Sequence, residues 1–200
     1  IWAWCQFWNI GRNEEIQMNE QSLISDIVTA ERGPRLTGQI YWPLFNCQVP
    51  VTLGRDGTVS LQYAERCVSQ LLHLEKAEID SLLRASIAYF RDEEYCHGEP
   101  IEMMFEFEGM PYPEGLEQPE RILPYIKPVE ISIDREVPSV ESVSIFSECA
   151  WEPEHSLQWV VRNGKALFAC GGLGSHGEDQ LYLEIWKEQN YLISAPRGKN

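Results

Sequence analysis

The sequence predicts an α+β domain in which a mainly antiparallel sheet carries a two-helix segment at about residues 63–94. Three observations lead to this fold class. Strand-like segments separated by turn residues fill the C-terminal third, two helical patterns adjoin in the middle, and strands and helices do not alternate as in parallel sheets. The length and the 44% apolar content fit a single domain over residues 1–200, to which residues 1–37 could be an N-terminal embellishment.

The N-terminal region predicts one strand and one short helix. Tryptophans fall on one parity within residues 1–10, which indicates a strand with an aromatic face. Residues 22–30 carry apolar side chains at helical spacing, and Gly33-Pro34 would end that helix.

A hairpin is predicted next, with arms at residues 48–53 and 58–62. The dipeptide Asp56-Gly57 lies between the arms and is typical of tight hairpin turns. Pro50 lacks a backbone N–H, so its position indicates that the first arm is an edge strand or begins irregularly.

Two helices follow, at residues 63–72 and 76–94. The second has apolar residues at helical spacing, which define one buried stripe. Its last turn, residues 92–94, is acidic, the unfavourable charge for a helix C-terminus, so we expect fraying or a cationic partner there. The stripe consists of Ile79, Leu82, Leu83, Ile87 and Phe90.

Residues 101–108 alternate between apolar and acidic side chains, which predicts a half-buried strand with an acidic outer row. Residues 110–128 hold five prolines and predict a long, partly extended loop. The C-terminal third predicts five more strands, with Asn163-Gly164 as a tight hairpin turn. These strands are residues 129–133, 143–149, 157–161, 166–170 and 181–187.

The charge balance narrows the classes of partner. The chain has 31 acidic and 16 basic side chains and a net charge of −15. This balance disfavours nucleic acids and anionic membranes, which are bound through Lys and Arg, and favours cationic proteins. Solubility alone is the alternative explanation. Dispersed cysteines without a CxxC pair, and no signal peptide or membrane span, predict reduced thiols and a cytoplasmic location.

Three motifs could carry chemistry, and each has a simpler interpretation. Glu154 and His155 could form an acid/base pair or part of a metal site of a small hydrolase, or lie in a strand-connecting turn. Cys96-His97 could be a nucleophile pair, but adjacent side chains seldom face each other. The glycine-rich residues 171–177 lack the Lys and the helix of a phosphate-binding loop. We therefore expect no catalytic residues, no metal and no cofactor.

Acidic and aromatic residues between positions 102 and 117 could form a binding surface, and such a surface needs no exact catalytic spacing. Interfaces often combine an aromatic anchor with charges matched to the partner, so we predict a partner-binding surface here. The alternative is a solvated face on an edge that resists aggregation. The predicted binding residues are Glu102, Glu106, Glu108, Tyr112, Glu114 and Glu117.

Residues from about 38 to 190 resemble a group of uncharacterised bacterial proteins. The resemblance is carried by the helix pair whose second helix ends in Ala88-Tyr89-Phe90 and by the Trp-acid-x-Glu-His motif at residues 151–155, which a hairpin follows. Proteins of this pattern are associated with immunity to bacterial toxins. The resemblance implies an inhibitor that binds and neutralises a cognate, basic toxin. A hydrolase at Glu154 and His155, or a scaffolding domain without a site, are the alternatives.

Overall fold

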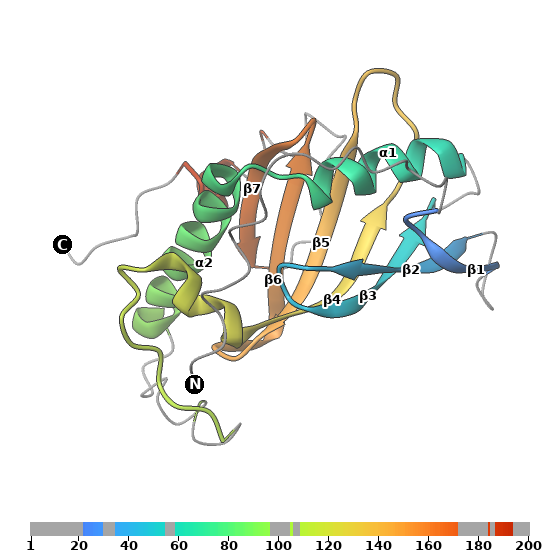
Figure 1. Ribbon diagram of the computed structural model, residues 1–200. Helices are drawn as coiled ribbons and strands as arrows, with labels where there is room; N and C mark the ends of the chain where they lie inside the picture. The colour runs from blue at the N-terminus through green and yellow to red at the C-terminus, as the bar shows by residue number, and fades with distance from the viewer. Residues whose placement is uncertain are drawn as a thin grey trace, which may run out of the picture.

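The computed structural model describes residues 22–29, 35–54, 59–96, 105, 109–171, 184 and 187–193. It has an α+β fold built on one seven-stranded sheet (Figure 1). The strands are β1 (Ser25–Thr29), β2 (Leu36–Trp42), β3 (Cys47–Leu53), β4 (Ile126–Ile133), β5 (Ser142–Cys149), β6 (Glu152–Arg162) and β7 (Lys165–Gly171). The helices are α1 (Leu61–Leu72) and α2 (Lys76–Cys96), with short 3-10 helices η1 (Pro119–Tyr125) and η2 (Lys187–Gln189).

The strands lie in the sheet in the order of the chain, from β1 to β7. All neighbouring pairs are antiparallel except β3 and β4, which pair in parallel from Val51↔Ile131 to Leu53↔Ile133. A parallel pair needs a long crossover, and α1, α2 and η1 supply it. The prediction of a mainly antiparallel sheet is therefore confirmed, while this one crossover was not predicted.

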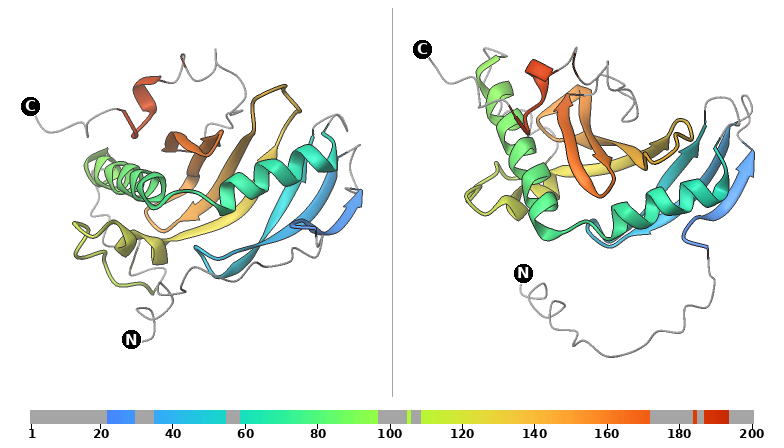
Figure 2. Two further views of the ribbon diagram at one scale, coloured as in Figure 1. Left: turned by 45° about the horizontal axis from the view of Figure 1, so that its top comes forward. Right: turned by 90° about the horizontal axis from the view of Figure 1, so that it is seen from above.

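The main core lies between the helices and one face of the sheet (Figure 2). α2 contacts β6, β7 and η1, and α1 contacts β5. One row of buried residues follows the register across five strands, so it lines the helix-covered face. That row is Val51, Ile131, Ile145, Trp159 and Ala169.

Local sequence explains both helices. Ser60 caps α1, because its hydroxyl accepts a hydrogen bond from the backbone N–H of Tyr63 at 3.2 Å. The first helix thus begins at Leu61, two residues before the predicted start, and the second ends at Cys96 rather than at residue 94. The predicted stripe of α2 is buried apart from Ile79, which is half-buried.

The helix predicted at residues 22–30 is wrong, because β1 (Ser25–Thr29) occupies most of that range at the edge of the sheet. The register between β1 and β2 shifts between Ser25 and Val28, and Asp26 has a φ of 53°. An extra residue at such a bulge breaks the alternation of a strand. It brings the apolar side chains to a spacing that resembles that of a helix.

The predicted hairpin at residues 48–53 and 58–62 is also wrong. β3 pairs with β2 across a turn in which the Phe45 N–H donates to the Trp42 carbonyl at 3.2 Å. Asn46 closes this turn with a φ of 52°. The expected second arm instead leads into α1, and residues 55–58 lie outside the described part of the chain. Pro50 precedes the part of β3 that pairs with β4, so its missing N–H leaves that pairing intact.

The proline-rich segment is more ordered than predicted. η1 begins at Pro119, a position at which the missing N–H of proline leaves no hydrogen bond unmade. β4 begins directly after the end of η1. Pro128 lies within β4, next to a register shift and outside the stretch paired with β3. Pro119 and Pro128 thus occupy positions where a helix or strand can do without their N–H.

Two predicted strands lie mostly outside the described residues. Of residues 101–108 the structure describes only Phe105, which is buried as expected but helical rather than extended. Of residues 181–187 it describes Glu184, which is helical, and Lys187, which begins η2. The strand predicted at residues 1–10 also lies outside the described ranges. The Asn163-Gly164 turn between β6 and β7 is confirmed, with φ angles of 50° and 70°.

The outer edge of β7 is covered by the segment at residues 187–193. Asn190 accepts from the Ala169 N–H at 3.1 Å and donates to the Leu167 carbonyl at 2.9 Å. Tyr191 donates its backbone N–H to Ala169 at 2.9 Å. These bonds occupy groups that an open edge strand would otherwise offer to another chain.

Candidate interaction surface

Three of the predicted binding residues lie in one described segment before η1. Tyr112, Glu114 and Glu117 belong to residues 112–120, which we call the acidic loop. Glu102, Glu106 and Glu108 lie outside the described residues, so whether they adjoin the loop stays a prediction. The structure adds Glu120, in the first turn of η1, to the same exposed segment.

Buried side chains fix the backbone of the acidic loop. Pro113 and Pro119 are buried, and the half-buried ring of Tyr112 packs 5.7 Å from that of Phe90 and 5.5 Å from that of Phe105. Gly115 has a φ of 69°, which favours glycine, and its carbonyl accepts from the Gln118 N–H at 3.1 Å. The loop is thus held at both ends and turned at a defined glycine.

The carboxylates of the loop point to solvent. Glu114, Glu117 and Glu120 are all exposed, and none makes an ion pair with any described residue. The nearest basic side chain along the chain, Arg121, donates to the Gln118 amide at 3.4 Å instead. Burial first, and then the charge of Glu114, raise the pKa of the Tyr125 phenol. The loop therefore presents negative charge that forms no ion pair with a described residue, on a fixed backbone.

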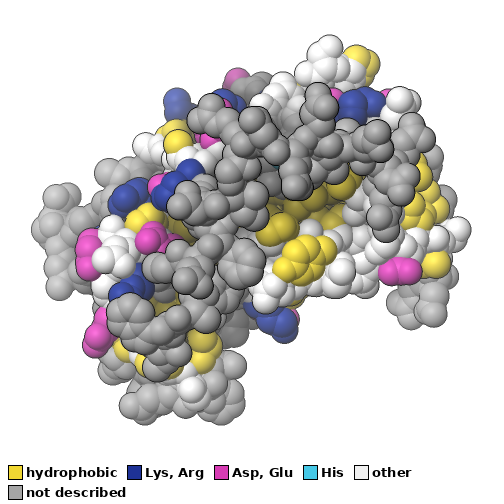
Figure 3. All heavy atoms as spheres, in the orientation of Figure 1, with side chains coloured by type: hydrophobic (Ala, Val, Ile, Leu, Met, Phe, Trp, Pro, Cys, Tyr) yellow, Lys and Arg dark blue, Asp and Glu magenta, His cyan; other side chains and the backbone are white. Residues whose placement is uncertain are grey.

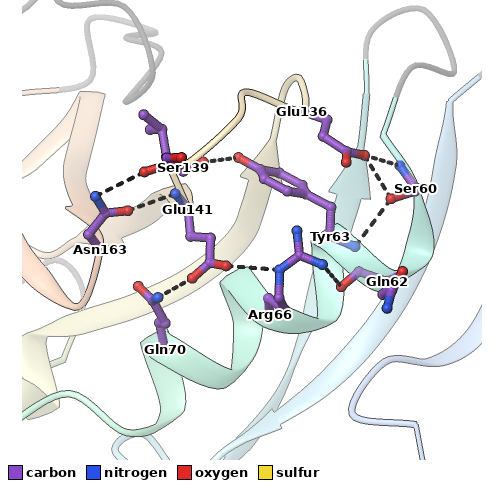
Figure 4. Close-up of polar contacts among 10 residues, drawn as sticks. Ser60, Gln62, Tyr63, Arg66, Gln70, Glu136, Ser139, Glu141 and Asn163 are labelled. Carbon is purple, nitrogen blue, oxygen red and sulfur yellow. Dashed lines mark hydrogen bonds and ion pairs between the residues drawn. The ribbon is translucent and has the colours of Figure 1, made fainter.

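A second group of polar residues holds α1 to the sheet (Figure 4). Glu141 accepts from the Arg66 Nε at 2.9 Å and from the Gln70 amide, while its own backbone N–H donates to Asn163 at 2.8 Å. Asn163 also donates to the Ser139 carbonyl at 3.4 Å. This network joins α1, the β4–β5 connection and the β6–β7 turn, so its contacts account for a structural role.

The first turn of α1 adds to these contacts. The Ser60 hydroxyl and backbone N–H both donate to Glu136, and the Tyr63 hydroxyl donates to the Val140 carbonyl. Burial raises the pKa of the Tyr63 phenol, and burial raises the pKa of the Cys67 thiol to about 11. Burial thus favours the protonated form of both groups at neutral pH.

Residues 26–176 match the model of a family described as a domain of unknown function, DUF6985. The chain belongs to the DUF6985 family. The matched range extends from β1 past the end of β7 and includes both helices and the acidic loop. Comparisons with curated proteins and with solved structures found no match.

In this DUF6985 chain, the strand-connecting turn ends before Glu154 and His155, the residues of the predicted acid/base pair. Ala150 and Trp151 form the β5–β6 turn, and Trp151 is buried against the rings of Tyr89 and Phe90. Glu154 and His155 instead lie within β6, and their side chains are outside the described part. Within the described ranges no three His, Cys, Asp or Glu side chains are arranged to hold a metal ion.

The other two motifs lie at the limits of the described chain. Cys96 is the last residue of α2 and Gly171 the last of β7, while His97 and residues 172–177 are outside the described ranges. The sequence did not predict the contact that Asp92 makes at the acidic end of α2. Asp92 is buried and accepts from the Tyr191 hydroxyl at 2.7 Å, so a neutral donor rather than a cation lies against it.

Four cysteines of the DUF6985 chain have described side chains, and all four are free thiols. Cys67, Cys149 and Cys170 are buried, while Cys47 is half-buried. None of the helices in the described ranges is long and apolar enough to cross a membrane.

Proposed function

We propose that this protein is an immunity-type inhibitor that binds and neutralises a cognate, basic bacterial toxin in the cytoplasm. The observation that carries the proposal is the acidic loop. It presents Glu114, Glu117 and Glu120 without ion pairs to the described residues, on a backbone held by two buried prolines. In this proposal the protein acts by covering its partner and has no catalytic residues.

The loop has the physical properties that rapid binding to a cation requires. A segment ordered before binding loses fewer conformations when the complex forms. Exposed carboxylates on an acidic molecule, with its net charge of −15, accelerate the encounter with a basic surface. Tyr112 retains some exposed surface beside these charges, and tyrosine is common in interface centres.

The test begins with identification of the partner by crosslinking and affinity capture from the producing cells. Association is then measured with the variant Glu114→Lys/Glu117→Lys/Glu120→Lys. A pair at the rim of an interface contributes about 1 kcal/mol or less, so the triple change should raise the Kd roughly 10-fold to 100-fold. Most of this loss should lie in the association rate, and the salt dependence of that rate should weaken.

The chain offers a matched control. Glu75, Glu148 and Glu184 are also exposed and lie outside the loop, so their replacement by lysine changes the net charge equally. The control variant should keep most of the affinity, because its charges lie outside the acidic loop. Equal losses in both variants would show that net charge, and not this loop, governs binding, and would overturn the assignment of the site.

A further inference from the structure

A groove of about 370 Å³ follows the exposed side of α2. Small residues of the helix, including Ser81 and Ala88, line it together with Leu192 and the acidic-loop residue Leu116. Arg84 and Arg91 also line it. The groove and the acidic loop are therefore neighbours on one surface of the molecule.

The two arginines are unusual in so acidic a chain. They are seven residues apart, so they lie on one side of the helix, with a rise of about 10 Å between them. Both are exposed, and neither forms an ion pair with a residue in the described ranges. Basic side chains gather over α2 beside apolar and acidic ones (Figure 3). Positive charge is thus concentrated next to the negative loop but not neutralised by it.

We propose that two copies of this chain form a two-fold symmetric dimer in which each acidic loop lies over the α2 groove of the other copy. Glu114 and Glu117 of one copy would pair with Arg84 and Arg91 of the second, and the reverse contact would form at the same time. A two-fold interface requires a self-complementary patch. Adjacent charges of opposite sign, without ion pairs among the described residues, meet that requirement on one surface.

Apolar side chains are also present on this surface. Leu116 and Leu192 are half-buried and line the groove, and Ile193, which follows Leu192, is 61% exposed. Stable interfaces combine an apolar centre with a charged rim and bury about 800 Å² on each copy. Nucleic acid suits the patch less well, because its phosphates would meet the glutamates beside the arginines.

The net charge of −15 on each copy opposes association at long range. Salt screens that repulsion over about 8 Å at physiological ionic strength, while ion pairs in direct contact are screened less. Dimerisation should therefore be measured near 0.15 M salt, at concentrations up to about 100 µM. The dimer does not depend on the toxin partner, but a basic partner would compete with it for the same glutamates.

Sedimentation equilibrium tests the dimer with two charge-reversal variants. One is the loop variant Glu114→Arg/Glu117→Arg and the other is the groove variant Arg84→Glu/Arg91→Glu. The wild-type chain should dimerise, and each variant alone should be monomeric because like charges face each other. In an equimolar mixture both contacts again join opposite charges, so the two variants should form a heterodimer.

The loop variant separates local pairing from general repulsion. It is less negative than the wild type, so relief of repulsion would strengthen its self-association, whereas loss of the ion pairs weakens it. Circular dichroism checks that both variants are folded. A wild-type monomer at every concentration, a loop variant that dimerises as the wild type does, or a mixture that stays monomeric would each overturn the dimer. The proposed function would stand, because its own test compares two triple variants against the captured partner.

Discussion

At the scale of single residues, a buried hydrogen bond joins α2 to the sheet. The indole Nε1 of Trp159 donates to the Ser86 hydroxyl at 2.9 Å, and that hydroxyl donates to the Leu82 carbonyl at 2.9 Å. Both side chains are almost fully buried. A buried N–H without an acceptor costs more than a hydrogen bond gains, so this serine has a defined role in the core.

Replacing Ser86 by alanine should therefore lower the free energy of unfolding by about 1–3 kcal/mol, because the Trp159 N–H loses its acceptor. The matched control is Ser81→Ala. Ser81 also donates to a carbonyl one turn earlier, at 2.8 Å, but it is exposed. Its replacement should be neutral or stabilising by about 0.5 kcal/mol. Urea unfolding followed by tryptophan fluorescence measures the free energy of unfolding of both variants. Equal effects of the two substitutions would contradict the role of Ser86.

The sequence could not reveal this pair. Helical spacing identified the apolar residues Leu82, Leu83 and Phe90, because burial of apolar side chains is periodic. A serine within such a helix is indistinguishable from a surface serine until its partner is known. Trp159 lies 73 positions away in the sequence, and only the fold brings the two together.

At the scale of elements, Glu78 joins the start of α2 to the start of β7. Its carboxylate accepts from the Ala166 N–H at 2.9 Å and from the Lys165 Nζ at 3.0 Å. The Ala166 hydrogen bond, followed by Lys165, lowers the pKa of Glu78. A carboxylate in the first turn is also favoured by the helix dipole.

The variant Glu78→Gln should reduce the free energy of unfolding by about 1 kcal/mol at pH 7, since the amide keeps the shape but loses the charge. A carboxyl group whose pKa is lowered by folding stabilises the protein above its ordinary pKa. That contribution is lost as the pH falls through the lowered pKa. Unfolding curves of the variant and the wild type should therefore converge in acid, and a difference independent of pH would contradict the ionic contribution.

Element boundaries show where sequence patterns fail. The Asn163-Gly164 turn and the α2 stripe were predicted because each depends on neighbouring residues alone. β1 was missed because its edge position and bulge come from pairing with β2. Gly38 indicates how close that pairing is, since a Cβ there would lie 2.5 Å from Ile24 and 2.9 Å from the Ser25 carbonyl.

At the scale of the whole molecule, the sequence predicted the fold class, and the binding surface that it indicated stays a prediction. Composition indicated an acidic binding surface, and proline content located the segment that carries Glu114 and Glu117. Neither composition nor proline content could place this segment beside α2, because that contact follows from the crossover between β3 and β4. The groove with Arg84 and Arg91 was missed for the same reason. Two arginines on a charged helix face have no distinguishing pattern in sequence.

At alkaline pH, buried thiols and phenols make the stability of the molecule depend on pH. Burial raises the pKa of Cys67 to about 11 and that of Cys149 to about 12, and it also raises the pKa values of Tyr63 and Tyr89. As the pH rises, these groups lose their protons at a lower pH in the unfolded chain than in the folded protein. The stability that they contribute is therefore complete below their ordinary pKa values and is lost as the pH rises towards the folded values.

We expect the free energy of unfolding to be constant from pH 7 to about 8.5 and to fall beyond pH 9, by up to about 1.4 kcal/mol per pH unit for each group that ionises on unfolding. Urea titrations at successive pH values, with a reductant present, measure this fall. The variant Cys67→Ala keeps a small apolar side chain but removes one thiol, so its stability should fall less steeply above pH 9. Identical slopes for the variant and the wild type would show that Cys67 is not titrated on unfolding in this range.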